Sequence, residues 1–324
     1  MQQYVTNGIR GITSNPTIFE NAIANTNLYD NQIKQLKAEG KNSEEVYWEI
    51  AKQDIKNSAA ILKSIYTETG GSDGFVSLEV SPEFAHDTEA TIAQARQLWS
   101  DLHDKQSVEN LMIKVPATKA GIPAIRALLS EGVNVNITLL FSVERYKEVI
   151  KAYKTAIQLQ PNVKSVASFF VSRIDTMVDP LLQDQHDSEA DNITGRVALA
   201  QAHIAYDIFS KAFGSNTSGD VQKILWASTS TKNPDYDKLI YVKSLLATNT
   251  INTLPDATIE AIEQVDNFEF RAIDQLSIES SRQVMRVLAN QAMSIEEICT
   301  ELEVQGVQKF KDSFKSLLAT IESK

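Results

Sequence analysis

Cysteine is nearly missing from this sequence, which has one, Cys299, in 324 residues. A single thiol excludes an internal disulfide and argues against a zinc–thiolate cluster. Apolar residues recur with helical spacing across 294–302, which predicts that Cys299 is a small core residue of a helix whose Glu296 and Glu297 face solvent. The sequence also lacks a membrane-spanning apolar run and a signal-peptide pattern, so we expect a cytoplasmic protein with no membrane partner.

Positive charge is in the minority: 31 Lys and Arg stand against 42 Asp and Glu, and the formal net charge is −11. Nucleic-acid surfaces need clustered basic side chains, so this balance argues against a nucleic-acid partner. Glycine-rich nucleotide motifs of the G-x-G-x-x-G and G-x-x-x-x-G-K-[ST] types are absent as well. The composition is otherwise that of a globular protein, 43% hydrophobic and 23% charged, and we expect one large α/β domain over residues 1–324.

Seven short, mostly apolar runs alternate with longer segments of helical periodicity. The runs predict strands at 8–15, 75–80, 110–117, 134–140, 165–171, 223–228 and 250–254. Helices are expected at 17–70, with a break near 40–43, and at 87–102, 118–130, 143–159, 195–213, 237–247 and from 256 to 324. The polar segment 179–192 is expected to be a surface loop. Strands joined by helices predict a parallel sheet and a (β/α)8 TIM-type barrel, although such a barrel has eight strands.

A single lysine, Lys114, interrupts the apolar run 110–117. Such a run is typical of a strand that is buried on both faces of a parallel sheet. A buried ammonium group is costly unless it is paired or loses its proton, and a neutral amine can attack a carbonyl carbon to form a Schiff base. The structural alternative is a lysine that snorkels from the strand end or is neutralised by a carboxylate.

Polar residues at the ends of the other runs point to a shared site, because the active site of such a barrel lies at the carboxyl ends of its strands. The expected members are Asn15, Glu79, Lys114, Asn136, Thr138, Ser168, Arg173 and Ser228. Glu79 can relay protons to Lys114, directly or through a water held by Thr138, or it can form a structural ion pair; both interpretations stay open. Asn15 and Asn136 can hydrogen-bond a substrate without adding charge.

These residues lie in motifs that resemble those of one family. The motifs are Gly11-Ile-Thr-Ser-Asn-Pro-Thr17, Ser77-Leu-Glu-Val80, Met112-Ile-Lys-Val-Pro-Ala-Thr118, Val135-Asn-Ile-Thr-Leu-Leu-Phe-Ser142, Ser168-Phe-Phe-Val-Ser-Arg173 and Trp226-Ala-Ser-Thr-Ser-Thr-Lys-Asn-Pro234. In this order they resemble the successive signatures of the transaldolases over nearly the whole chain. The long helical C-terminus and the last motif resemble the longer bacterial branch of that family.

The resemblance implies a class I reaction with no cofactor and no metal, in which a dihydroxyacetone unit moves between sugar phosphates of the pentose phosphate pathway. Lys114 would form the Schiff base with a ketose phosphate, either sedoheptulose 7-phosphate or fructose 6-phosphate. Glu79 would shuttle protons through a water positioned by Thr138.

The resemblance also implies substrate-binding residues, which are Asn15, Asn136, Ser168, Arg173, Ser228 and Lys232. Arg173 and Ser228 match the family's phosphate-binding residues, and a guanidinium offers a planar fork for a phosphate dianion. In one branch of the family an arginine follows that serine by two residues, a position that Ser230 occupies here. Lys232 is the expected substitute for that arginine, although it is not matched to a phosphate-binding residue of the family.

One feature of the family has no counterpart: a first strand that ends in an aspartate acting as acid and base in C–C cleavage. The seven predicted strands then correspond to strands two to eight of an incomplete barrel. Two explanations compete. The start of the sequence is misassigned or truncated, or the chain is a decayed paralogue that is kept as a sugar-phosphate-binding module or a subunit. Another class I aldolase is the alternative enzyme. Unpaired edges at the strands around Ile12 and Ile251 predict poor solubility or a homo-oligomer.

Overall fold

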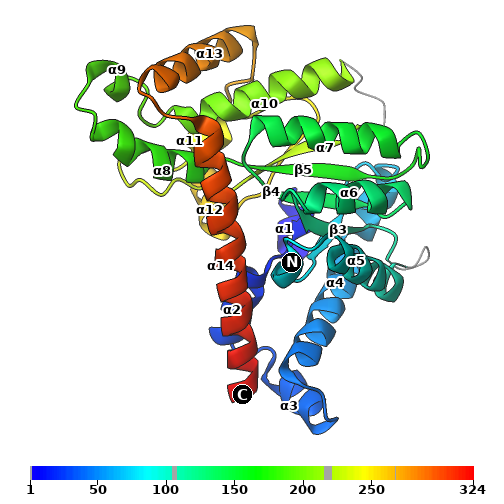
Figure 1. Ribbon diagram of the computed structural model, residues 1–324. Helices are drawn as coiled ribbons and strands as arrows, with labels where there is room; N and C mark the ends of the chain where they lie inside the picture. The colour runs from blue at the N-terminus through cyan, green and yellow to red at the C-terminus, as the bar shows by residue number, and fades with distance from the viewer. Residues whose placement is uncertain (1, 104–107, 215–220, 267) are drawn as a thin grey trace. The chain divides into compact units, whose positions relative to one another are not determined.

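The computed structural model describes residues 2–103, 108–214, 221–266 and 268–324 (Figure 1). The strands are β1 Ile12–Thr13, β2 Val76–Glu79, β3 Leu111–Pro116, β4 Val135–Leu140, β5 Ser165–Phe170, β6 Lys223–Ala227 and β7 Thr250–Asn252. The helices are α1 Gln2–Thr6, α2 Pro16–Ala24, α3 Asp30–Ala38, α4 Ser43–Glu68, the 3-10 helix η1 Pro82–Phe84, α5 Thr88–Leu102, α6 Gly121–Ser130, α7 Val143–Ala156, α8 Ser172–Gln183, α9 Ser188–Asp191, α10 Val197–Phe213, α11 Ile240–Ser244, α12 Asp256–Glu263, α13 Gln275–Asn290 and α14 Ile295–Ser323. Every helix in these described ranges is too short or too polar to cross a bilayer.

The strands follow one another in one seven-stranded sheet, in chain order from β1 to β7. The pairs β1–β2, β2–β3, β5–β6 and β6–β7 are parallel. Helical segments separate each strand from the next, which is the connectivity of a β/α barrel. Over the described residues β1 and β7 lie at the two ends of the strand order. The prediction of an incomplete TIM-type barrel of seven strands with extra C-terminal helices is therefore confirmed.

The local sequence explains why these elements form. β2, β3, β4 and β5 are buried along their whole lengths, as expected of apolar runs in a parallel sheet. α4 begins at a capping box in which Asn42 and Glu45 each accept from the other's backbone N–H. Asp87 caps α5 by accepting from Ala90 N. These caps fix the helix starts that the sequence predicted.

The first of two compact units comprises Met1–Val115, Lys119–Asn136 and Gly306–Lys324. An aromatic cluster holds its two chain ends together. The ring of Tyr47, on α4, is edge-on to Phe19 at 5.6 Å and to Phe314 at 5.3 Å between ring centroids. Lys324, the last residue, also pairs with Asp30 at 2.5 Å. Edge-to-face aromatic packing adds to the burial term, so the end of α14 stabilises the helices near the N-terminus.

The second unit comprises Pro116–Thr118 and Ile137–Gln305. Trp226 of β6 is fully buried and lies edge-on to Phe169 of β5, with centroids 6.3 Å apart. α13 packs on α10 (Figure 1), where His203 Nδ1 is 2.9 Å from Ser281 Oγ. Cys299 is 2% exposed, which confirms it as a core residue. The single domain expected over residues 1–324 stays a prediction.

Three segments differ from the expectation. The prediction of a surface loop at 179–192 is wrong, because α8 and α9 occupy most of this range. Asp179 is 6% exposed and accepts from Gly195 N at 2.8 Å, so its polarity does not mark a surface position. α1 forms where no element was expected. α11 is shorter than 237–247, since Asp237 Oδ1 accepts from Leu239 N at 2.9 Å in a local turn.

Candidate active site

Glu79 and Lys114 form a buried ion pair in the first unit. β2 and β3 are parallel, and their register places the two residues side by side. Glu79 Oε2 lies 3.1 Å from Lys114 Nζ, and the residues are 5% and 4% exposed. Nζ also donates to the carbonyl oxygen of Ser14 at 3.1 Å. The lysine is therefore held inside the unit, which argues against a side chain that snorkels to solvent.

The electrostatics of this pair are set by burial. Burial raises the pKa of the Glu79 carboxyl, and the neighbouring Lys114 ammonium offsets part of that rise. Burial also raises the pKa of Tyr47, with a further contribution from the Glu79 charge. A carboxylate that is costly to keep charged takes a proton readily, as a general base must. The pair thus has the properties of both interpretations, a structural ion pair and a proton relay.

Asn136 and Asn15 lie in the same unit in different surroundings. Asn136 is 1% exposed and donates through Nδ2 to Ser77 Oγ at 3.0 Å. Asn15 is half-buried, and its Oδ1 accepts from Ile18 N at 2.9 Å as the N-cap of α2. Because the cap engages the side-chain oxygen, we expect the amide nitrogen of Asn15 to be the group that meets a ligand.

Thr138 and Ser168 are buried strand residues of the second unit, 0% and 2% exposed. Thr138 Oγ1 has no hydrogen-bond partner among the residues that the structure describes. The next residue, Leu139, has a φ of 52°, a left-handed conformation that leucine rarely adopts. A buried hydroxyl without a partner in the protein is suited to hold a water or a substrate hydroxyl.

Ser228 and Lys232 belong to the segment between β6 and α11, in the second unit. Ser228 has a φ of 56°. Its Oγ is 3.1 Å from Ser172 Oγ, and its carbonyl oxygen accepts from Ser172 N at 2.9 Å. Lys232 is exposed and donates to Ser230 Oγ at 3.0 Å. The structure thus joins Ser228 to the residue directly before Arg173.

Arg173 is a half-buried residue in the first turn of α8. Its Cζ lies 5.5 Å from the centroid of the Phe170 ring, within range of a cation–π contact. Burial lowers the pKa of Arg173. A guanidinium that is partly removed from water gains by binding an anion, which is the property expected of a phosphate-binding residue.

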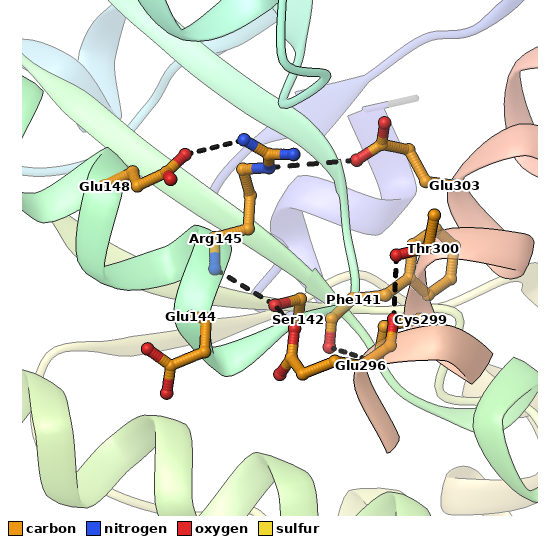
Figure 2. A pocket seen from close by; sticks show the side chains of 9 residues that line it. All are labelled: Phe141, Ser142, Glu144, Arg145, Glu148, Glu296, Cys299, Thr300 and Glu303. Carbon is orange, nitrogen blue, oxygen red and sulfur yellow. Dashed lines mark hydrogen bonds and ion pairs between the residues drawn. The ribbon is translucent and has the colours of Figure 1, made fainter. Parts of the chain in front are cut away.

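A cavity of about 120 Å³ between α7 and the first turns of α14, in the second unit, is acidic (Figure 2). Its lining includes Arg145 and the glutamates Glu144, Glu148, Glu296 and Glu303. Arg145 pairs with Glu148 at 2.6 Å and lies 3.9 Å from Glu303. The excess of carboxylates repels an anionic ligand, so this cavity does not suit a sugar phosphate.

Glu296 corrects one expectation. Glu297 is exposed as predicted, but the solvent-facing position predicted for Glu296 is wrong. Glu296 is half-buried and accepts from Ser142 Oγ, the N-cap residue of α7, at 2.5 Å. Despite these carboxylates, no three His, Cys, Asp or Glu side chains in the described part of the chain are grouped to hold a metal ion.

A second cavity of the same unit, about 170 Å³, lies on α8 and includes Lys232. Asp175, Asp179, Tyr236 and Tyr241 also line it, and sequence reasoning had missed these four. Burial raises the pKa of Asp175 to about 7. The available signal was the spacing of two aspartates four residues apart after Arg173, which places both on one helical face.

Comparison with known proteins gives one consistent result. A family model described as transaldolase/fructose-6-phosphate aldolase matches residues 1–321. A transaldolase from Frankia alni is 41% identical over 325 residues, which cover 96% of this chain and 86% of the relative. A transaldolase from Mycobacterium leprae is 40% identical, with 97% and 86% covered. Transaldolase 2 from Streptomyces coelicolor is 38% identical, with 97% and 87% covered.

Proposed function

Because the chain belongs to the transaldolase/fructose-6-phosphate aldolase family, we propose that it is a transaldolase that moves a dihydroxyacetone unit from a ketose phosphate to an aldose phosphate. The observation that carries the proposed mechanism is the buried pair of Glu79 and Lys114 on adjacent strands, with Oε2 and Nζ 3.1 Å apart. It combines the nucleophile and the proton acceptor that Schiff-base chemistry needs.

Lys114 is the proposed nucleophile. Its amine adds to the C2 carbonyl of the donor, and loss of water from the carbinolamine gives a protonated imine. The imine takes up the electron pair when the C3–C4 bond breaks, and the C4 hydroxyl gives its proton to the Glu79 carboxylate, which is free again after the loss of water. An aldose phosphate leaves and a three-carbon enamine stays on Lys114. The enamine then adds to the aldehyde carbon of the acceptor, whose oxygen takes that proton back. Hydrolysis of the new imine returns the free amine and releases the product ketose phosphate.

Glu79 is the proposed proton shuttle. The attacking amine must be neutral, and the Glu79 carboxylate is close enough to take its proton. The raised pKa of Glu79, caused by burial, supports this role because it makes the carboxylate a stronger base. Thr138 is proposed to hold the water through which protons pass, since its buried hydroxyl has no partner among the described residues.

The remaining residues are proposed to bind the substrate: Asn15, Asn136, Ser168, Arg173, Ser228 and Lys232. The amide and hydroxyl groups of the first three suit sugar hydroxyls and the intermediates, because they add no charge. Arg173, half-buried and anchored on an aromatic ring, suits the phosphate dianion. Ser228 and Lys232 add a hydroxyl donor and a second positive charge from one connecting segment.

Turnover of fructose 6-phosphate with and without an aldose phosphate acceptor tests this proposal. A four-carbon acceptor should yield a seven-carbon ketose phosphate together with glyceraldehyde 3-phosphate. Release of free dihydroxyacetone without an acceptor would identify an aldolase instead, and no conversion under either condition would contradict an active enzyme. Lys114→Met should abolish turnover, whereas Lys119→Met, at an exposed position five residues later, should not.

A further inference from the structure

Two aspartates of α8 link this helix to the segment that carries Ser228 and Lys232. Asp175 and Asp179 are four residues apart on one helical face and are 2% and 6% exposed. Tyr241 OH donates to Asp175 Oδ2 at 2.8 Å. Tyr236 OH donates to Asp179 Oδ2 at 2.7 Å. These four side chains are called the Asp–Tyr pairs below.

The second oxygen of each aspartate is also engaged. Asp175 Oδ1 accepts from Ala198 N at 2.7 Å, and Asp179 Oδ1 accepts from Gly195 N at 2.8 Å. Both carboxylates are therefore fixed by backbone donors at the start of α10. The carboxylate oxygen that accepts from each tyrosine hydroxyl is therefore held in one orientation.

Gly195 provides room for one of these tyrosines. It has a φ of 71°, and a Cβ at this position would lie 2.7 Å from Cζ and OH of Tyr236. Such a distance is too short for any side chain, so only glycine allows the Tyr236 ring to lie here. Ring and hydroxyl are thus both held in place, by Gly195 and Asp179.

The same connecting segment is attached to α8 at its other end. Val171 N donates to Ala227 O and Ser172 N donates to Ser228 O, each at 2.9 Å. The chain between Ser228 and Tyr236 is therefore fixed at both ends, and Lys232 lies between them. Arg173 directly follows Ser172 in the first turn of the same helix.

We propose that the Asp–Tyr pairs are positioning residues that hold the segment 228–241, which runs from the end of β6 into α11, on α8 and thereby set the preference of the enzyme for phosphorylated substrates. The inference rests on the proposed function, because it assumes that Arg173, Ser228 and Lys232 bind the phosphate group. The pairs act through these residues and do not touch the substrate. Loss of either tyrosine hydroxyl removes one of the two side-chain bonds that attach the C-terminal part of this segment to α8, which weakens phosphate binding, while the Schiff-base chemistry at Lys114 is unchanged.

Tyr236→Phe and Tyr241→Phe test the proposal, because each removes a hydroxyl and keeps the ring. The matched control is Tyr29→Phe in the first unit, where Tyr29 OH donates to Asp54 Oδ2 at 2.7 Å. Borohydride inactivation is measured against the concentration of fructose 6-phosphate and, separately, of unphosphorylated dihydroxyacetone. We expect the half-saturating concentration of fructose 6-phosphate to rise about tenfold in the two test variants, equivalent to about 1.4 kcal/mol. The value for dihydroxyacetone should not change, and Tyr29→Phe should change neither value.

A structural role alone would affect both substrates or neither. Equal shifts for both, or no shift in folded Tyr236→Phe and Tyr241→Phe, would overturn the positioning role. If Tyr236→Phe does not fold, Asp179→Asn takes its place, because it keeps an acceptor for Gly195 N and alters the bond to Tyr236. Asp175→Asn replaces Tyr241→Phe in the same way, because it keeps an acceptor for Ala198 N and alters the bond to Tyr241. Failure of the proposed function looks different: the wild-type protein would then not be inactivated by either substrate with borohydride.

Discussion

Replacement of Glu79 by glutamine separates the chemistry of the buried pair from its structural role. Glutamine nearly preserves the size of the side chain but removes the charge and the ability to take a proton. Glu79 is 5% exposed and 3.1 Å from Lys114 Nζ, so bulk water is not expected to replace the lost carboxylate. We therefore expect one effect on catalysis and another on stability.

The catalytic effect follows from the proton-shuttle role. A positioned acid–base group typically contributes roughly 100- to 10,000-fold to the rate, so we expect Glu79→Gln to lower the rate constant of Schiff-base formation by that factor. Glu79→Asp keeps a carboxyl group, one methylene further back, and should lose less. The assay is single-turnover formation of the borohydride-trapped adduct. If Glu79→Gln retains more than about a tenth of the wild-type rate, the pair is a structural ion pair and not a proton relay.

The effect on stability follows from burial. Removal of one partner of a buried ion pair costs about 3–5 kcal/mol, so Glu79→Gln and Lys114→Met should both lower the free energy of unfolding in urea. Burial raises the pKa of Glu79, so its unpaired carboxyl can take up a proton in Lys114→Met, and the loss in that variant should shrink as the pH falls. The double variant with Glu79→Leu and Lys114→Met should recover most of the loss. Single variants within about 1 kcal/mol of wild type would refute this reasoning.

Three further predictions concern the second unit. Arg173→Ala should weaken the binding of fructose 6-phosphate by about 1.5–3 kcal/mol relative to that of dihydroxyacetone, measured from the half-saturating concentrations. Arg173→Lys should lose less binding free energy. Equal losses for both ligands would contradict a phosphate contact. Burial raises the pKa of Asp175 to about 7, so the folded state keeps a proton that the unfolded state releases, and the free energy of unfolding should fall as the pH rises from about 4 to about 7. Asp175→Asn should remove this pH dependence of the free energy of unfolding, which amounts to on the order of 4 kcal/mol between about pH 4 and pH 7. The same pH profile in wild type and Asp175→Asn would contradict the raised pKa of Asp175. Burial also raises the pKa of Cys299 to about 12, so a thiol reagent at neutral pH should find no reactive thiol in the folded chain and one after unfolding.

Much of the fold could be predicted because apolar runs and helical periodicity dominate this sequence. The run around Lys114 predicted β3, and the run 75–80, which contains Glu79, predicted β2. Their adjacency then follows from the βαβ rule that successive parallel strands pair. The side-by-side position of Glu79 and Lys114, the proposed nucleophile, could therefore be predicted from the sequence.

The rest depends on tertiary contacts that local patterns do not encode. Asp179 looked like part of a polar loop, but its carboxylate is buried against Gly195 N and the Tyr236 hydroxyl. Glu296 looked solvated, but it meets the N-cap of α7. Ser228 has a left-handed φ and its carbonyl oxygen accepts from Ser172 N, and a serine at this position of the sequence predicts neither. In each case a polar residue acts on a partner more than 15 positions away along the chain.

The identity of the Schiff-base lysine is the most direct measurement. The wild-type protein is treated with fructose 6-phosphate and borohydride, digested, and mapped by mass spectrometry for the reduced three-carbon adduct. We expect label on the peptide that contains Lys114, none in Lys114→Met, and unchanged label in the Lys119→Met control. Label on any other lysine, or no label on a protein that turns over fructose 6-phosphate, would contradict the proposed mechanism.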